Sequence, residues 1–197
     1  MPYDPTLVTW KALNAANDAT ATGLQDLRTG ATEYGGALNS GMYFDLTETQ
    51  AAQLSNTTTG TLHAGRYRRV QVDSGATASN VKTGAIGLMV AGGQPQLNLV
   101  TSYDKGIVGA HAVIFLNSIT PGNWGFVQEL GIATVLMGAT LEKAAPASGD
   151  LINSTTLGVG QDNTLQEFVP ASIGIALSPP SPNTKGLVLL TLPVLQG

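Results

Sequence analysis

The sequence predicts an all-β protein: a small sandwich or barrel of short antiparallel strands, preceded by an extended N-terminal arm with at most one or two short helices. Two observations support this fold class. From Thr61 onward, short apolar stretches recur at intervals of about 10 to 20 residues, and Gly, Pro, Asn or Asp separates them. Hydrophobic residues make up 43% of the 197-residue chain, which is enough for a sizeable core. Because a single sequence does not show which strands pair, sandwich and barrel both remain open.

The chain divides near Thr61 into an arm, residues 1–60, and a β-domain, residues 61–197. The arm is rich in Ala, Thr, Asn and Gly and has few large apolar side chains, so it cannot bury much surface by itself. Within it, "LTETQAAQL" places Thr47 three residues before Gln50, the capping-box spacing that predicts one short helix. An apolar patch near the start supplies candidate contact residues for a partner: Leu7, Val8, Trp10 and Leu13.

The β-domain contains a series of predicted strands. The first four are "YRRVQVD", "AIGLMV", "LNLVTSY" and "HAVIFLN". The next stretch, "GFVQELGIATVLM", contains Gly131 and predicts two short strands joined by a tight connection. The last three are "DLINS", "ASIGIAL" and "GLVLLTLPVL". The final strand, Leu187 to Leu192, is apolar on both faces, so we expect it at the centre of the sheet or beneath a neighbour.

The segment "TPGNWGF", residues 120–126, predicts a chain reversal followed by a strand. Pro121 and Gly122 suit the central positions of a type II turn, because proline fixes φ and glycine tolerates the positive φ that follows. Trp124 then begins a hairpin, and Gly125 predicts a bulge or a close backbone approach. An indole here either anchors a subunit interface or covers the core of its own subunit. Trp124 and Phe126 are therefore the candidate subunit-interface residues.

Charge and composition restrict the classes of partner. Charged residues make up 11% of the chain, against roughly 25% in typical soluble domains. A neutral surface suits a protein that packs against other subunits, since each buried charge must be desolvated and paired; a secreted or stable β-domain is the alternative. The net charge of −4 disfavours nucleic acid as a partner, because phosphates require clustered Lys and Arg. The basic segment "RYRR" instead begins a strand that places Arg69, Gln71 and Asp73 on a solvated face.

Several further features bear on location and chemistry. The N-terminus lacks a basic region followed by an apolar run, and no stretch approaches the roughly 18 apolar residues of a membrane helix. We therefore expect synthesis in the cytoplasm and no membrane partner. The chain has no cysteine, which excludes disulfides and thiolate metal sites.

The sequence predicts no catalytic, cofactor-binding or metal-binding residue. His63 and His111 each stand alone at the start of a predicted strand, without a second histidine at metal-ligand spacing. No G-x-S-x-G nucleophile motif occurs, and "LGVGQDN" lacks the third glycine of a dinucleotide fingerprint, so we expect a loop there. The aspartates that could form a calcium site or a glycosidase pair are scattered over turns, where they normally bond nearby backbone: Asp73, Asp104, Asp150 and Asp162.

Several segments together resemble the capsid decoration, or cement, proteins of tailed bacteriophages. They are "TLHAGRYRRVQVDSGATASNVKTGAIGLM", "VTSYDKG", "FLNSITPGNWGFVQELGIATVL", "AAPASGDLI" and "IGIALSPP…LVLLTL", which span about Thr61 to Leu192. The most specific part is the phrase "TPGNWGF" followed by "GIATVL". The resemblance implies a small β-rich protein without an active site or cofactor, bound to major capsid protein on the outside of an icosahedral virion shell. It also implies a homo-oligomer, often a trimer, with residues 1–60 as an arm that reaches onto the shell.

Two other classes of function remain open from the sequence. A head-fibre or tail-associated carbohydrate-binding module would also be all-β and rich in threonine, but it would need a cluster of exposed aromatics, and aromatics are only 6% of this chain. A phage-encoded hydrolase would need a convergent acid, base and nucleophile. The sequence contains no motif that supplies them.

Overall fold

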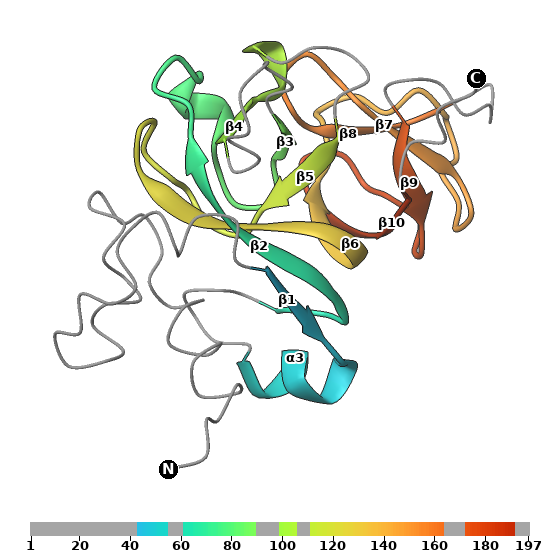
Figure 1. Ribbon diagram of the computed structural model, residues 1–197. Helices are drawn as coiled ribbons and strands as arrows, with labels where there is room; N and C mark the ends of the chain where they lie inside the picture. Colours follow the sequence, from blue (N-terminus) through green and yellow to red (C-terminus); the bar gives the residue numbers. More distant parts are fainter. Residues whose placement is uncertain (1–42, 55–60, 90–98, 106–110, 164–171, 192–197) are drawn as a thin grey trace, which may run out of the picture.

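The computed structural model of the chain describes residues 43–54, 61–89, 99–105, 111–163 and 172–191 (Figure 1). Within these residues, ten strands form one sheet, in the order β1-β2-β4-β3-β5-β6-β10-β9-β7-β8. The strands are β1 (Tyr43–Leu46), β2 (Gly65–Val72), β3 (Ile86–Met89), β4 (Leu99–Ser102), β5 (Ala112–Phe115), β6 (Trp124–Leu136), β7 (Leu151–Ser154), β8 (Gly160–Asp162), β9 (Ser172–Ala176) and β10 (Lys185–Leu190). The helical elements are α3 (Glu48–Leu54) and two single 3-10 turns, η3 (Ala78–Asn80) and η4 (Tyr103–Lys105). The predicted all-β class is confirmed.

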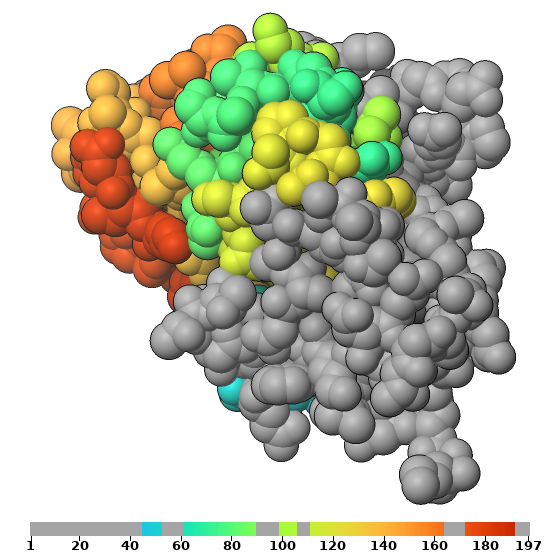
Figure 2. Space-filling view, turned by 90° about the vertical axis from the view of Figure 1, so that its left-hand side faces the viewer, coloured from blue at the N-terminus to red at the C-terminus, as the bar shows by residue number. Residues whose placement is uncertain are grey.

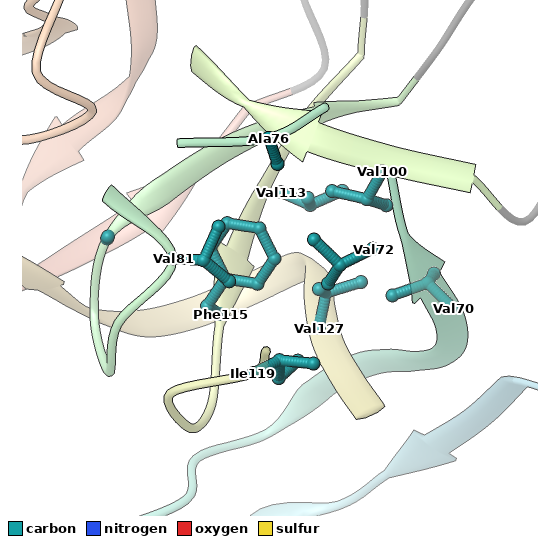
Figure 3. Close-up of a cluster of buried hydrophobic side chains, with 10 residues drawn as sticks. Val70, Val72, Ala76, Val81, Val100, Val113, Phe115, Ile119 and Val127 are labelled. Carbon is teal, nitrogen blue, oxygen red and sulfur yellow. The ribbon is translucent and has the colours of Figure 1, made fainter. Parts of the chain in front are cut away.

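The first half of the sheet closes into a five-stranded barrel. β2 pairs with β4, β4 with β3, β3 with β5 and β5 with β6, and β6 returns to pair with β2. Valine side chains from these strands surround the ring of Phe115 in the interior (Figure 3). Val70 and Val72 of β2 and Val127 of β6 are fully buried there. Even eight-stranded barrels are only wide enough to hold side chains, so this narrower barrel is a packed core.

The second half of the sheet forms another circuit that also begins at β6. From β6 the hydrogen-bonded order runs through β10, β9 and β7 to β8. Met137, directly after β6, then makes a parallel bridge to Gly160 of β8, and the Gly138 N–H donates to the Gly160 carbonyl at 2.8 Å. The interior contains a second buried cluster: Ile86, Ile114, Ala133, Val135, Met137, Ile152, Ile173, Ala176, Val188 and Leu190. Ile86 and Ile114 come from strands of the first barrel, so the two cores share a wall.

The two barrels lie side by side. In Figure 2 the orange and red residues of the C-terminal half lie beside the green and yellow residues of the first half of the sheet. Strand pairing is antiparallel except between β2 and β4, which are parallel over Gln71↔Leu99 and Val72↔Val100. The observed closure selects the barrel over the sandwich, which the sequence had left open.

The predicted hairpin at Gly131 is wrong, because β6 is one continuous strand of 13 residues. Gly131 does adopt a positive φ of 92°, but it lies opposite Gly65 within the β2–β6 ladder and bends the strand there. The pairing register shifts between Arg66 and Tyr67, and Glu129 is the extra residue on β6. As a result, the first half of β6 pairs with β2 and β5, and the second half pairs with β10.

Two other segments differ from the sequence expectation. "LGVGQDN", expected to be a loop, contains the short strand β8, because Gly160 and Asp162 pair with Ser154 and Ile152 of β7. The predicted arm contributes β1, a strand that the residue pattern did not indicate. Both strands are short and depend on a partner elsewhere in the sheet for their hydrogen bonds.

The predicted capping box and short helix are confirmed in α3. The Thr47 N–H donates to Oε1 of Gln50 at 3.0 Å, and the Gln50 N–H donates to Oγ1 of Thr47 at 3.4 Å. These reciprocal bonds satisfy backbone donors that have no partner inside the first turn of a helix. The beginning of the helix is thus determined by local sequence.

Side chains of β1 and α3 hold the segment before the barrel against the start of β2. Asp45 accepts two hydrogen bonds from Arg66, at 2.7 Å from Nε and 3.0 Å from Nη2. Glu48 accepts the Ala64 N–H at 2.7 Å and lies 3.2 Å from Nδ1 of His63. In Figure 1, α3 lies at the bottom of the molecule, joined to the barrel through β1. We call these contacts the arm base.

The close approach at Gly131 gives the first testable prediction. A Cβ at Gly131 would collide with the Ala64 carbonyl oxygen and lie 2.6 Å from Cα of Gly65, in addition to the strain of its positive φ. Gly131→Ala should therefore lower the free energy of unfolding by about 3 kcal/mol or more, measured by urea denaturation.

Gly122→Ala is the matched control for this substitution. Gly122 has nearly the same φ, 90°, but a Cβ there would meet nothing within 4 Å. It should cost only the backbone strain, about 1 to 2 kcal/mol. If the two variants lose equal free energy of unfolding, the close contact between β6 and β2 at Gly131 does not stabilise the fold.

Candidate functional site

The sequence predicted two contact regions, and the structure describes one of them. Leu7, Val8, Trp10 and Leu13 lie outside the described residues, so their role in the arm stays a prediction. Trp124 and Phe126 lie at the start of β6, directly after the reversal at residues 120–123. The predicted type II turn is confirmed by φ of 90° at Gly122 and by the hydrogen bond from the Asn123 N–H to the Thr120 carbonyl at 2.9 Å.

Trp124 and Phe126 share one face of the sheet with Arg69. The Arg69 guanidinium carbon lies 5.7 Å from the Trp124 ring centroid and 5.9 Å from that of Phe126, within the range of cation–π attraction. Arg69 is 0% exposed and Phe126 is 1% exposed, whereas Trp124 is only partly buried. Of the predicted pair, Phe126 is thus an interior residue of the chain, whereas Trp124 keeps part of its side chain exposed.

The buried position of Arg69 corrects the solvated face that the sequence predicted for β2. The alternation was correct, since Val70 and Val72 point into the barrel and Arg69 points to the opposite face. That opposite face is not wet at Arg69, because Phe126 lies directly across the ladder and Trp124 lies two residues earlier on the same side. Sequence alone could not reveal this pairing between residues more than fifty positions apart.

Two histidines were the candidate chemical groups, and each lies just before a strand. His63 precedes β2 and contacts Glu48, while His111 precedes β5 and is half-buried. Burial lowers the pKa of His111; the charge of Glu129 opposes this shift and that of Arg68 adds to it. Arg68 and Glu129 form an ion pair at 2.8 Å, with Glu129 almost completely buried. The charges nearest to His111 are therefore already paired with each other.

The aspartates that the sequence placed in turns accept hydrogen bonds from backbone and side chains, and one of them, Asp162, lies in strand β8 instead of a turn. Asp73 accepts the N–H of Gly75 at 3.1 Å, the local bond expected of a turn aspartate. Asp162 is fully buried and accepts the N–H groups of Glu142 and Lys143 at 2.6 and 2.9 Å.

Asp150 continues this network. It accepts Nζ of Lys143 at 2.5 Å and the Ala147 N–H at 2.8 Å. Partial desolvation raises the pKa of Asp150, but hydrogen bonds from Lys143 and Ala147 outweigh it and lower the pKa. Asp150 and Asp162 therefore fasten the segment between β6 and β7 to the second barrel.

The described residues include a small pocket, lined in part by β5, β6 and β10. No group of three or more His, Cys, Asp or Glu side chains in this part of the chain is placed to hold a metal ion. The pocket of about 40 Å³, with Thr83, Gln128 and Lys185 among its lining residues, has room for little more than water. No helix within the described ranges is long and apolar enough to cross a bilayer.

One surface feature was not found from the sequence: an aliphatic face on the outside of the second barrel. Leu189 of β10 lies between Ile132 of β6 and Ile175 of β9, and the Leu177 N–H donates to the Leu187 carbonyl at 2.8 Å. Leu177 and Leu189 are 42% and 40% exposed. The aliphatic face consists of Ile132, Leu136, Ile175, Leu177, Leu187 and Leu189, all of them exposed or half-buried. The final strand is thus central in the sheet, as expected, but one of its faces is open.

The comparisons with known proteins add little to this description. No protein-family model matches the sequence, and no curated protein matches it. Among solved structures, the crystal structure of the head fiber gp8.5 N base in bacteriophage phi29 overlaps with a TM-score of 0.43 at 11% sequence identity, covering 64% of this chain and 92% of that chain. An overlap this loose establishes neither a common fold nor a common function.

The hydrogen bonds around Asp104 predict a specific acid sensitivity. Partial desolvation raises the pKa of Asp104, but hydrogen bonds from Thr77, Ser102 and Asn80 outweigh it and lower the pKa to about 2. The ionised carboxylate thus stabilises the fold above the unfolded pKa of 3.8, and this contribution is lost as the pH falls towards 2. Because the residue is partly solvated, we expect about 1 kcal/mol.

This prediction is checked by measuring the free energy of unfolding of wild type and Asp104→Asn between pH 6 and pH 2. The wild type should lose about 1 kcal/mol more than the variant over this range. Asp73→Asn is the control, since its carboxylate accepts one exposed backbone N–H, from Gly75. If Asp104→Asn and wild type show parallel pH profiles, the Thr77–Asn80–Asp104 network does not stabilise the fold in the proposed way.

Proposed function

We propose that this protein is a structural component of a tailed-bacteriophage virion that binds the outer surface of the icosahedral capsid and stabilises the shell. The observation that carries the proposal is the aliphatic face, which suits a protein that works in an assembly with further copies of itself and with other subunits. Two closed barrels with filled interiors still present uncharged leucine and isoleucine side chains to water. Contiguous apolar surface on a soluble protein marks a site of contact with another macromolecule.

The positions of the segments that resemble decoration proteins support the same proposal. Their most specific phrase, "TPGNWGF" with "GIATVL", forms the type II turn and most of β6, the strand common to both barrels. The resemblance therefore involves residues that determine the architecture of the whole β-domain. The role that it implies is structural and involves no catalysis or cofactor.

The proposed partners are the major capsid protein and further copies of the chain, as a trimer. In this proposal Leu7, Val8, Trp10 and Leu13 contact the capsid protein, since apolar side chains on a weakly folding arm fit pockets on a shell. The arm base supports a role for the arm in capsid contact. Asp45 and Glu48 fasten the end of the arm to the first barrel, so a contact made by the arm also restrains the β-domain.

The described aromatic residues do not favour the alternative of a carbohydrate-binding head-fibre or tail module. Such a module stacks sugar rings on exposed aromatics. Tyr67, Phe115 and Phe126 are buried, and the half-buried Tyr103 and Trp124 lie on different elements. This leaves the virion-shell role as the better supported function.

The role is tested by titrating capsids assembled without the protein with wild type and Trp10→Ala, and measuring occupancy by co-sedimentation. Loss of a buried aromatic anchor costs about 2 kcal/mol, so the affinity should fall about thirtyfold. Deleting residues 1–42, which leaves β1 and α3 in place, should reduce binding further.

Leu157→Ala is the control for Trp10→Ala. Leu157 is a highly exposed leucine of the β-domain and belongs to no proposed capsid contact, so this variant should saturate capsids like wild type. Identical curves for wild type, Trp10→Ala and the deletion would remove the arm from the mechanism, and Trp124→Ala would test the other candidate surface. No binding by wild type would contradict the proposed function itself.

A further inference from the structure

The aliphatic face belongs to three adjacent strands that otherwise build the second core. In β10, Val188 and Leu190 point into that core, while Leu187 and Leu189 point outward. The same alternation occurs in β6, where Ala133 and Val135 are inside. The outward residues therefore do not contribute to the second core, whose positions other residues of the same strands occupy. They form a second, parallel layer of apolar side chains with no described layer above it.

The face is almost free of charge. Along the paired stretch of β6 and β10, the outward residues are Ile132 opposite Leu189, Thr134 opposite Leu187 and Leu136 opposite Lys185. Ile175 and Leu177 extend the face onto β9 and beyond its end. Lys185, at one edge, is the single charged side chain among these positions. An apolar surface without charge is complementary to a copy of itself, because their contact desolvates no ion.

A second copy of the chain is also the partner that is present from the moment of synthesis. Exposed aliphatic sheet surface promotes non-specific association if it stays uncovered. A specific contact with an identical chain would cover this surface, and the concentration of that partner always equals the concentration of the protein.

The dimensions fit the centre of such a contact. Neighbouring strands are about 4.8 Å apart, so the aliphatic face is about 10 Å across its three strands. A stable interface buries about 800 Å² per partner, with an apolar centre inside a polar rim. The face supplies the centre, and Thr134 and Lys185 begin the rim.

We propose that the aliphatic face of β6, β9 and β10 is the surface through which one copy of the chain packs against another. This assigns self-association to Leu177, Leu187 and Leu189, away from Trp124, which the sequence had suggested. In Figure 1, β9 and β10 form the right-hand side of the molecule, whereas α3 and the arm base lie at the bottom. The inference does not depend on the virion role, because it concerns the free protein.

The test compares Leu189→Glu and Leu177→Glu with Leu157→Glu. Leu157 is the matched control because it is also an exposed leucine, 64% accessible, but lies in the turn between β7 and β8. Analytical ultracentrifugation over the micromolar range should show an oligomer for wild type and Leu157→Glu. The two substitutions in the face should weaken self-association at least about tenfold each.

Three results would overturn the inference: a monomeric wild type, oligomers that survive both substitutions in the face, or equal losses in all three variants. Thermal unfolding of each variant checks the fold. We expect near-wild-type midpoints, since the altered side chains are already exposed in the single chain.

A second measurement avoids any charge in the face. The chain has no cysteine, so one introduced cysteine is a unique attachment point. Leu177→Cys treated with a short bis-maleimide should give covalent dimers, and Leu157→Cys should give few. Equal cross-linking of the two would contradict the inference. Capsid occupancy is measured separately, so an oligomeric protein that fails to bind capsids contradicts the proposed function and leaves this inference standing.

Discussion

The architecture depends on the close contact between β6 and β2 at two glycines. Gly65 and Gly131 face each other in the ladder, and a side chain on Gly131 would meet the backbone of Ala64 and Gly65. The bend at this point redirects β6 from the first barrel to the second. β6 thus pairs with β2 and β5 in its first half and with β10 in its second half, and it forms a wall of both barrels. Both cores, and the outward face of the second barrel, include residues of this one strand.

Several of the few charged side chains of this protein are buried in its interior. Only 11% of the residues are charged, yet Arg69, Glu129 and Asp162 are buried. Each has a defined environment: two aromatic rings beside Arg69, the Arg68 guanidinium beside Glu129, and two backbone N–H groups at Asp162. Buried charges are tolerated only with such partners, so a pairing of the strands that removed these partners would be destabilised.

Features set by neighbouring residues could be predicted from the sequence, and features set by distant ones could not. The capping box at Thr47 and the turn at Gly122 involve residues three or fewer positions apart, and both predictions were correct. The composition of most strands was equally local. The continuity of β6 depends on Gly65, far from Gly131 in the chain, and so its two halves looked like a hairpin. The aliphatic face, likewise, exists only because β10 pairs with both β6 and β9.

The arm base determines how a pulling force would reach the β-domain. Tension on the chain before Tyr43 acts first on the four-residue ladder between β1 and β2. The paired hydrogen bonds of Asp45 with Arg66 come next, and the contact of Glu48 with Ala64 follows. These side-chain bonds are exposed and individually weak, so we expect them to break before either barrel unfolds. Under such a load we expect the segment to extend while the barrels remain intact.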